Sequence, residues 1–257
     1  MTAIAAVIPA YNEARTIRDV AERTLQHVPF VVVVDDGSSD GTGAALAGLS
    51  VTLLRNDGNR GKAVSLAKGA EYALARGARA ILTLDGDGQH RPEDIPRLVA
   101  AYERDPGAVV IGSRLHDGDR IPRDRYLANR FANFWIAWAA GQPIADSQSG
   151  FRIYPAALLR EVRPRADRAS GFVFESEILI EAGRRRVRLM NVPISAIYPV
   201  RARRSHFRPV LDIAQITRMV AWKLLSRGLY LPGLVRSLQP TARDEVGDQT
   251  GGRGEAR

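Results

Sequence analysis

Cysteine is absent from the 257-residue sequence. Disulfide scaffolds, thiolate catalysis and cysteine-ligated zinc sites are therefore excluded, in keeping with a reducing compartment. Apolar runs of the roughly 18 to 20 residues needed to span a bilayer are also missing. Residues 1–6 lack the basic and then apolar pattern of a secretory signal. We therefore expect a cytoplasmic protein, either free or held at the inner face of the membrane.

Acidic residues are the minority charge: 28 Asp and Glu stand against 37 Lys and Arg, which gives a formal charge of +9. The stretch from Gly183 to Arg208 holds eight arginines and no acid. Such a stretch suits anionic lipid, the phosphates of a small substrate or a solvated face. The sequence shows no nucleic-acid-binding module and no basic segment interleaved with aromatics, so we expect no nucleic-acid partner.

Short apolar runs alternate with helical patterns, which predicts an α/β fold with a mostly parallel sheet covered by helices. The strands are predicted at 3–9, 30–34, 51–55, 80–84, 108–111 and 187–194, and the helices at 13–28, 62–76, 92–104, 131–140 and 209–225. Residues 114–149 are less regular and are predicted to form an insertion over a site, with a charged loop at 116–125.

Two carboxylates, Asp85 and Asp87, follow the apolar strand predicted at 80–84. The carboxyl ends of strands in open parallel sheets are where ligands bind. Residues two apart on an extended segment point the same way, so both carboxylates can reach one hard cation together with diphosphate oxygens. Gly86 and Gly88 leave the backbone open to a bulky ligand. A solvated acidic turn is the alternative. An EF-hand loop beginning at Asp85 is excluded by its spacing. The glycines at 61 and at 37–43 match neither a P-loop nor a dinucleotide fingerprint.

Further acids follow the first two predicted strands, at Glu13 and at Asp35 and Asp36. Both loops are predicted at the same sheet edge as Asp85. Their carboxylates can accept hydrogen bonds from a nucleobase or a ribose. Residues 38–42 are expected mainly to cap the following helix.

Six motifs in this order resemble those of family-2 glycosyltransferases, nearest to dolichol- and polyprenyl-phosphate sugar synthases. They are Ile8 to Glu13, Val33 to Ser38, Gly58 to Lys62, Leu84 to His90, Gly112 to Arg114 and Ser149 to Arg152. The resemblance covers residues 3–208. It implies a GT-A fold, a nucleotide-diphosphate sugar as donor, a divalent cation (Mg²⁺ or Mn²⁺) and inversion at the anomeric carbon.

The same resemblance implies roles for individual residues. The residues expected to bind the nucleotide sugar are Pro9, Ala10, Tyr11, Glu13, Asp35, Asp36, Lys62, Asp85 and Gly86. Those expected to hold the metal are Asp85, Asp87 and Gln89, and Arg114 and Arg125 are expected to contact phosphates or the acceptor. The residues expected on the sugar and acceptor side are Asp146, Ser149, Arg152, Arg201, Arg204, Ser205 and His206.

Two more acids, Glu175 and Glu177, follow a glycine. In relatives that glycosylate a hydroxyl, an acid in this region acts as base, whereas a phosphate acceptor is already an anion. Pairing of one acid with the arginines at 184–186 is the structural alternative. We therefore expect a polyprenyl phosphate as acceptor, and a hydroxyl acceptor with Glu175 or Glu177 as base is the alternative. A phosphohydrolase with Asp85 as nucleophile and an inactive nucleotide-sugar sensor are more remote hypotheses.

Three parts are expected along the chain: a glycosyltransferase domain at 1–208, a helical segment at 209–239 and a disordered tail at 240–257. The helix at 209–225 has one apolar face flanked by Arg218, Lys223 and Arg227, with Trp222 and Tyr230 as candidate interfacial anchors. This helix either contacts the membrane surface peripherally or docks on the catalytic domain.

Overall fold

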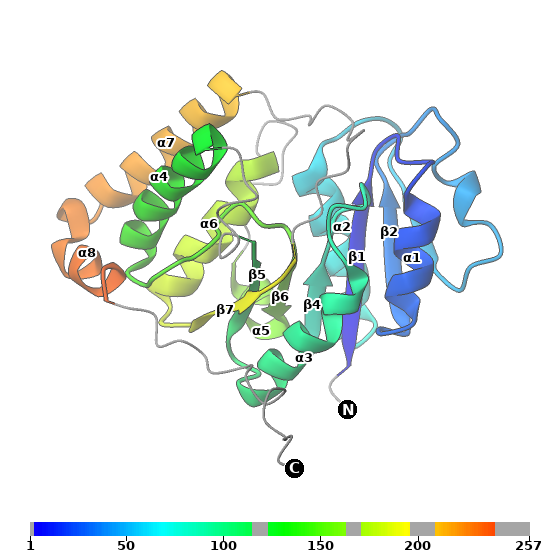
Figure 1. Ribbon diagram of the computed structural model, residues 1–257, viewed down its shortest axis with the longest axis horizontal. Helices are drawn as coiled ribbons and strands as arrows, with labels where there is room; N and C mark the ends of the chain where they lie inside the picture. Colours follow the sequence, from blue (N-terminus) through cyan, green and yellow to red (C-terminus); the bar gives the residue numbers. More distant parts are fainter. Residues whose placement is uncertain (1–2, 115–122, 163–170, 196–208, 240–257) are drawn as a thin grey trace, which may run out of the picture.

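The computed structural model describes residues 3–114, 123–162, 171–195 and 209–239. At its centre lies a seven-stranded sheet in the order β3-β2-β1-β4-β6-β5-β7 (Figure 1). The strands are β1 (Ile4–Ala10), β2 (Phe30–Asp35), β3 (Thr52–Arg55), β4 (Ala80–Thr83), β5 (Val109–Ser113), β6 (Arg152–Pro155) and β7 (Leu189–Pro193). Among the described strands, only β6 runs antiparallel to its neighbours. The expected mixed, mostly parallel sheet is therefore confirmed.

Helices cover both faces of this sheet (Figure 1). The α-helices are α1 (Ile17–Leu25), α2 (Lys62–Ala75), α3 (Ile95–Arg104), α4 (Arg123–Ala140), α5 (Ala156–Glu161), α6 (Gly171–Arg184), α7 (Pro209–Leu225) and α8 (Leu231–Ser237), and the 3₁₀ turns are η1 (Ala44–Leu46), η2 (Pro92–Asp94) and η4 (Gly228–Tyr230). Alternate side chains of β1 enter different cores, because successive residues of a strand point to opposite faces. Val7 belongs to the core that also holds buried residues of α2, α4, α6 and α7, whereas Ile8 belongs to the core with α1 and α3.

All predicted strands and helices are present, but several of their boundaries differ and four further strands or α-helices were not predicted. The helix predicted at 92–104 begins as the 3₁₀ turn η2, and the helix predicted at 13–28 is shorter. The loop predicted up to Arg125 ends earlier, since α4 already begins at Arg123. The elements that the sequence pattern did not reveal are β6, α5, α6 and α8.

The segment after residue 208 packs on the rest of the protein. Ile216, Val220 and Leu224 of α7 are buried in the same core as α4 and α6. The Trp138 indole on α4 donates a hydrogen bond to the Tyr230 carbonyl at 3.2 Å. Tyr230, one of the two candidate interfacial anchors, is half-buried. Within the described ranges, no helix is both long and apolar enough to cross a membrane.

Candidate active site

The loops after β1 and β2 bind one another at the carboxyl edge of the sheet. Ser38 Oγ accepts a hydrogen bond from the Asn12 N–H at 2.8 Å, and Thr42 Oγ1 accepts one from the Glu13 N–H at 2.8 Å. The next helical turn, η1, has no side-chain cap. The expected capping role of residues 38–42 is therefore wrong. Their hydroxyls instead satisfy backbone groups of the preceding loop, which fixes the Pro9 to Glu13 motif in place.

Asp35 and Asp36 are both buried at the end of β2, but their oxygens are used differently. Asp36 accepts from the Asn56 amide at 2.7 Å and from the backbone N–H groups of Arg60 and Gly61 at 2.9 and 2.8 Å. The Asp36 carboxylate therefore holds the loop at 56–61. Asp35 Oδ1 accepts from the Ser38 N–H, whereas its buried Oδ2 has no hydrogen-bond partner among the described residues. The same oxygen lies 3.7 Å from Arg55 Nε, so an ion pair is its contact with the rest of the described chain.

The acidic motif lies against the end of β1. The Thr16 hydroxyl donates to the Gly86 carbonyl at 2.7 Å, and Asp87 Oδ1 accepts from the Gln89 N–H at 2.9 Å. A Cβ added at Gly86 would meet the Pro9 carbonyl oxygen at 3.3 Å, so this glycine allows the two strand ends to approach closely. The contact that fixes Gln89 is made by its backbone.

His90 is a site residue to which sequence reasoning gave no role. It is 3 % exposed, and its Nδ1 accepts a hydrogen bond from the Asp85 N–H at 3.2 Å. Burial lowers the pKa of His90 to about 4, so the imidazole is neutral at pH 7 and remains able to accept. Its place directly after Gln89 in the acidic motif was the available signal. His90 orients the backbone that carries Asp85.

Three charged side chains converge beside this motif. Lys62 Nζ, at the start of α2, lies 2.6 Å from Asp85 Oδ1 and 3.3 Å from Glu175 Oε1 on α6. The latter oxygen is buried, and its contact with Lys62 lacks the geometry of a hydrogen bond. A Cβ added at Gly150 would lie 2.9 Å from Lys62 Nζ and 3.1 Å from an oxygen of each acid. Gly150 therefore leaves the space in which the three charges meet.

The two aspartates have opposite electrostatic environments. Burial would raise the pKa of Asp85, but the Lys62 charge outweighs it and lowers the pKa to about 2. Burial and the negative charge of Asp85 raise the pKa of Asp87. For Lys62 itself, burial lowers the pKa but the Asp85 and Glu175 carboxylates raise it further. Asp87 is therefore the acid whose negative charge is least compensated by the protein.

The carboxylates of Asp85 and Asp87 suit a divalent cation that takes its remaining ligands from a substrate. Asp85 and Asp87 offer hard carboxylate oxygens, the type that Mg²⁺ and Mn²⁺ bind. The repulsion between them, visible in the raised pKa of Asp87, is what a bound cation would relieve. Within the described residues, no group of three or more His, Cys, Asp or Glu could hold a metal. Phosphate oxygens or water would therefore complete the coordination shell.

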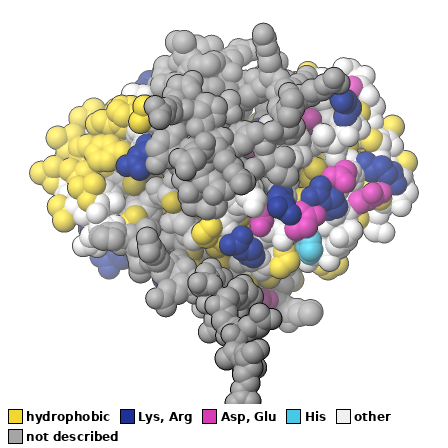
Figure 2. Space-filling model, in the orientation of Figure 1, with side chains coloured by type: hydrophobic (Ala, Val, Ile, Leu, Met, Phe, Trp, Pro, Cys, Tyr) yellow, Lys and Arg dark blue, Asp and Glu magenta, His cyan; other side chains and the backbone are white. Residues whose placement is uncertain are grey.

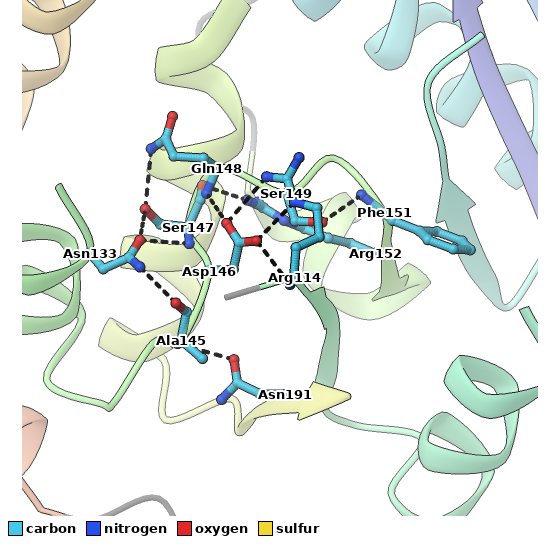
Figure 3. A network of polar contacts seen from close by, with 10 residues as sticks. All are labelled: Arg114, Asn133, Ala145, Asp146, Ser147, Gln148, Ser149, Phe151, Arg152 and Asn191. Carbon is cyan, nitrogen blue, oxygen red and sulfur yellow. Dashed lines mark hydrogen bonds and ion pairs between the residues drawn. The ribbon is translucent and has the colours of Figure 1, made fainter. Parts of the chain in front are cut away.

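Arg114, at the end of β5, is held by a buried carboxylate (Figure 3). Its Nε lies 3.0 Å from Asp146 Oδ2, and its backbone N–H donates to the same oxygen at 3.2 Å. Asp146 has no exposed surface, whereas the Arg114 side chain keeps 19 % of its own. Asp146 was expected to line the sugar side of the site. The structure instead places it behind Arg114.

Ser149 and Arg152 are also fully buried, which corrects their expected position on the acceptor side. Arg152 donates to the carbonyls of Ser147 and Glu175 at 2.7 and 2.9 Å and to the Tyr154 hydroxyl at 3.1 Å. Burial alone would lower the pKa of Arg152, but the charged groups around it raise it. The guanidinium therefore joins β6, α6 and the 145–149 loop from within.

The acids of α6 point to different partners. Glu175 faces Lys62, whereas Glu177 Oε1 lies 3.0 Å from Lys223 Nζ on α7. The structure therefore does not bring Glu177 to the site, and the arginines at 184 and 185 pair with Glu181 instead. Arg125 lies on α4, but its side chain is outside the described residues, as are Arg201, Arg204, Ser205 and His206.

A family profile and individual sequence relatives both match this chain. The profile of glycosyl transferase family 2 matches residues 5–163. The chain is 30% identical over 201 residues to polyprenol monophosphomannose synthase of Mycolicibacterium smegmatis, covering 74% of this chain and 75% of that one. It is 29% identical over 213 residues to UDP-N-acetylglucosamine–dolichyl-phosphate N-acetylglucosaminyltransferase of Methanococcus voltae, covering 75% and 84%.

Among solved structures, the fold is similar to glucosyl-3-phosphoglycerate synthase of Mycobacterium tuberculosis, in a complex with Mn²⁺, UDP and phosphoglyceric acid. The TM-score is 0.61 at 22% identity, and the match covers 87% of this chain and 78% of that one. This likeness confirms the expected GT-A fold.

Proposed function

Because this chain belongs to glycosyl transferase family 2 and is a nucleotide-sugar-dependent glycosyltransferase, we propose that its acceptor is a polyprenyl phosphate. The names of the two sequence relatives support this acceptor class, since one names dolichyl phosphate and the other a polyprenol monophosphomannose. The family assignment replaces the phosphohydrolase and inactive-sensor hypotheses.

The observation that carries the proposal is the position of Glu175 and Glu177, the two candidate bases for a hydroxyl acceptor. Glu175 is 3 % exposed and its Oε1 is enclosed beside Lys62. Glu177 is paired with Lys223 on the far side of α6. A hydroxyl acceptor needs a base that can reach its proton, whereas a phosphate attacks as an anion. An acceptor that carries its own charge therefore suits this site better.

The donor would lie along the edge formed by the ends of β1, β2 and β4. Asp35 is the acid we assign to a ribose or base hydrogen bond, which requires its buried Oδ2, now 3.7 Å from Arg55 Nε, to be uncovered when the donor binds. Tyr11 and Glu13 lie in the loop beside it. Asp85 and Asp87 would hold the divalent cation, with Gln89 next to them. When bound, this cation stabilises the negative charge that develops on the departing nucleoside diphosphate.

Cationic side chains of the chain itself complete the arrangement. Lys62 stands beside Asp85, and Arg114 is fixed by Asp146 with part of its surface exposed. Both can stabilise phosphate charge electrostatically as the anomeric carbon is attacked from the opposite side. Asp146, Ser149 and Arg152 act by holding the loop that positions these groups.

A matched pair of acceptors tests the proposal: a short-chain polyprenyl phosphate and the polyprenol of the same chain length. Each is incubated with UDP-, GDP- and dTDP-sugars in the presence of Mn²⁺ or Mg²⁺. We expect sugar transfer to the phosphate and none to the alcohol. Equal transfer to the polyprenol, or transfer only to a soluble hydroxyl acceptor with loss of activity in Glu175→Gln, would establish the base-catalysed alternative.

A further inference from the structure

One end of the molecule carries nearly all of its exposed large apolar side chains. Ten such side chains occur among the described residues, and nine of them lie on or next to α4, α7 and α8. These nine, which we call the apolar face, are Leu127, Phe131, Phe134, Trp222, Leu225, Leu229, Leu231, Val235 and Leu238. Figure 2 shows hydrophobic side chains gathered at the left of the molecule, where Figure 1 draws α7 and α8. Surface helices normally present polar residues outward, so an exposed apolar patch of this size indicates an interaction surface.

Helical spacing turns the apolar face into continuous stripes. Leu127, Phe131 and Phe134 follow one another at intervals of four and three residues along α4, and Leu231, Val235 and Leu238 do the same along α8 and its C-cap. Residues at this spacing share one side of a helix. The opposite side of α4 is buried in the core through Ile136 and Ala140. Both sides of α4 are therefore apolar, but only one has a partner within the described chain.

The helices that carry the apolar face are held firmly together. Tyr230 packs against Gly141 and Gly233, and the Arg227 guanidinium lies 4.0 Å from the centre of its ring. The Trp138 hydrogen bond to the Tyr230 carbonyl joins α4 to the turn before α8. The exposed side chains thus project from a fixed platform.

Among the described side chains of α4, α7 and α8 the exposed charges are cationic, whereas Asp124 and Asp212, near the starts of α4 and α7, have side chains outside the described residues. The sequence contains no Asp or Glu from Arg125 to Ala145, nor from Ile213 to Arg243. Arg130, Arg218 and Arg236 are exposed on the same helices. Lys223 differs, because it turns inward to Glu177 and Glu181 on α6. Apolar side chains surrounded by cations suit a surface that is apolar inside and anionic outside. Two copies of this face would bring like charges together.

We propose that α4, α7 and α8 form a docking face for an anionic lipid bilayer, with Trp222, which is 71 % exposed, at the interface. This inference rests on the proposed function, because docking would bring the active site to an acceptor that is anchored in the membrane. The structural link is Asn133 on α4, which donates to the Ala145 carbonyl at 2.7 Å and accepts from the Ser147 N–H at 2.8 Å. The helix that carries the apolar face therefore also holds the loop of Asp146.

Vesicle sedimentation tests the docking face directly. The full chain is mixed with vesicles of phosphatidylcholine alone or of phosphatidylcholine with phosphatidylglycerol. We expect binding to the anionic vesicles that weakens with added salt. The variants are Phe131→Ser on α4, Trp222→Ser on α7 and Val235→Ser with Leu238→Ser on α8, and the double variant should partition about tenfold less. Leu53→Ser is the matched control, because Leu53 is 42 % exposed on β3 at the other edge of the sheet.

Thermal unfolding of each variant establishes that it is folded, and substitutions on three separate helices keep the test valid if one of them fails. Absence of wild-type binding to anionic vesicles would overturn the proposal. So would equal binding by all variants, or a wild-type dimer in light scattering that the same substitutions dissociate. Without vesicles, the variants should glycosylate a water-soluble short-chain polyprenyl phosphate at the wild-type rate. Failure of that transfer in the wild type would count against the proposed acceptor and leave the docking face standing.

Discussion

Lys62 Nζ lies 2.6 Å from Asp85 Oδ1, so the first acid of the acidic motif is already paired with a cation of the protein. Lys62 repels a divalent cation at the same carboxylate by Coulomb interaction. Lys62→Ala should therefore bind Mn²⁺ more tightly in the absence of donor, by roughly fivefold or about 1 kcal/mol, while sugar transfer falls. Titration calorimetry with Mn²⁺ measures the first effect.

The matched control for this change is Lys68→Ala on the same helix. Lys68 donates to the Arg55 carbonyl and to Asn56 and makes no contact with Asp85. Its removal should leave Mn²⁺ affinity unchanged. Weaker Mn²⁺ binding in Lys62→Ala would mean that Lys62 orients Asp85 for the cation and does not compete with it.

Asp35 and Asp36 should respond differently to the same substitution. Asp36→Asn weakens three hydrogen bonds to a charged acceptor, each worth about 1.5 to 3 kcal/mol, so the free energy of unfolding should fall. Asp35→Asn retains an oxygen for the Ser38 N–H and should mainly weaken nucleotide binding. Urea unfolding and nucleotide titration separate the two effects. Unchanged nucleotide affinity in Asp35→Asn would place the ribose or base elsewhere.

Arg152→Met should destabilise the protein by about 3 to 5 kcal/mol, as expected when a buried charged network loses one member. The reason is that the carbonyls of Ser147 and Glu175 and the Tyr154 hydroxyl lose their shared donor. Urea unfolding provides the measurement, and Arg18→Met on the exposed surface of α1 is the control. A stable Arg152→Met protein with a raised acceptor KM would show that Arg152 contacts the acceptor directly.

Gly150→Ala should lower kcat without unfolding the protein. The new methyl group would crowd Lys62, Asp85 and Glu175, whose charged atoms lie about 3 Å from its position. Gly107→Ala is a suitable control, because a Cβ there meets its nearest neighbour at 3.6 Å. Initial rates and melting temperatures of both variants decide the point. A fully active Gly150→Ala enzyme would mean that this three-charge arrangement has no part in transfer.

The sequence predicted the edge of the sheet at which the site lies, because apolar strands and the acids that follow them are local patterns. It did not predict the pairing of Lys62 with Asp85, which joins the start of α2 to the end of β4. The family resemblance placed Arg152 on the sugar and acceptor side, but it begins β6, a strand of four residues that the sequence pattern did not reveal. Arginine is rarely buried, so its full burial was not expected. Glu175 and Glu177 remained equivalent candidates because α6 was not predicted. Once the helix is known, residues two apart point in different directions.

Asp87 is the residue on which the proposed metal site depends most directly. We would measure the initial rate of sugar transfer to polyprenyl phosphate in Mn²⁺ for Asp87→Ala, with exposed Asp57→Ala as control. Burial and Asp85 raise the pKa of Asp87, so its ionised form is disfavoured in the fold. The variant loses only the hydrogen bond from the Gln89 N–H and should melt close to wild type. We expect a loss of about 100-fold or more in the rate of Asp87→Ala, whereas Asp57→Ala should keep the wild-type rate and the wild-type dependence on metal. Full activity of Asp87→Ala, or of the wild type in excess chelator, would contradict the proposed metal site.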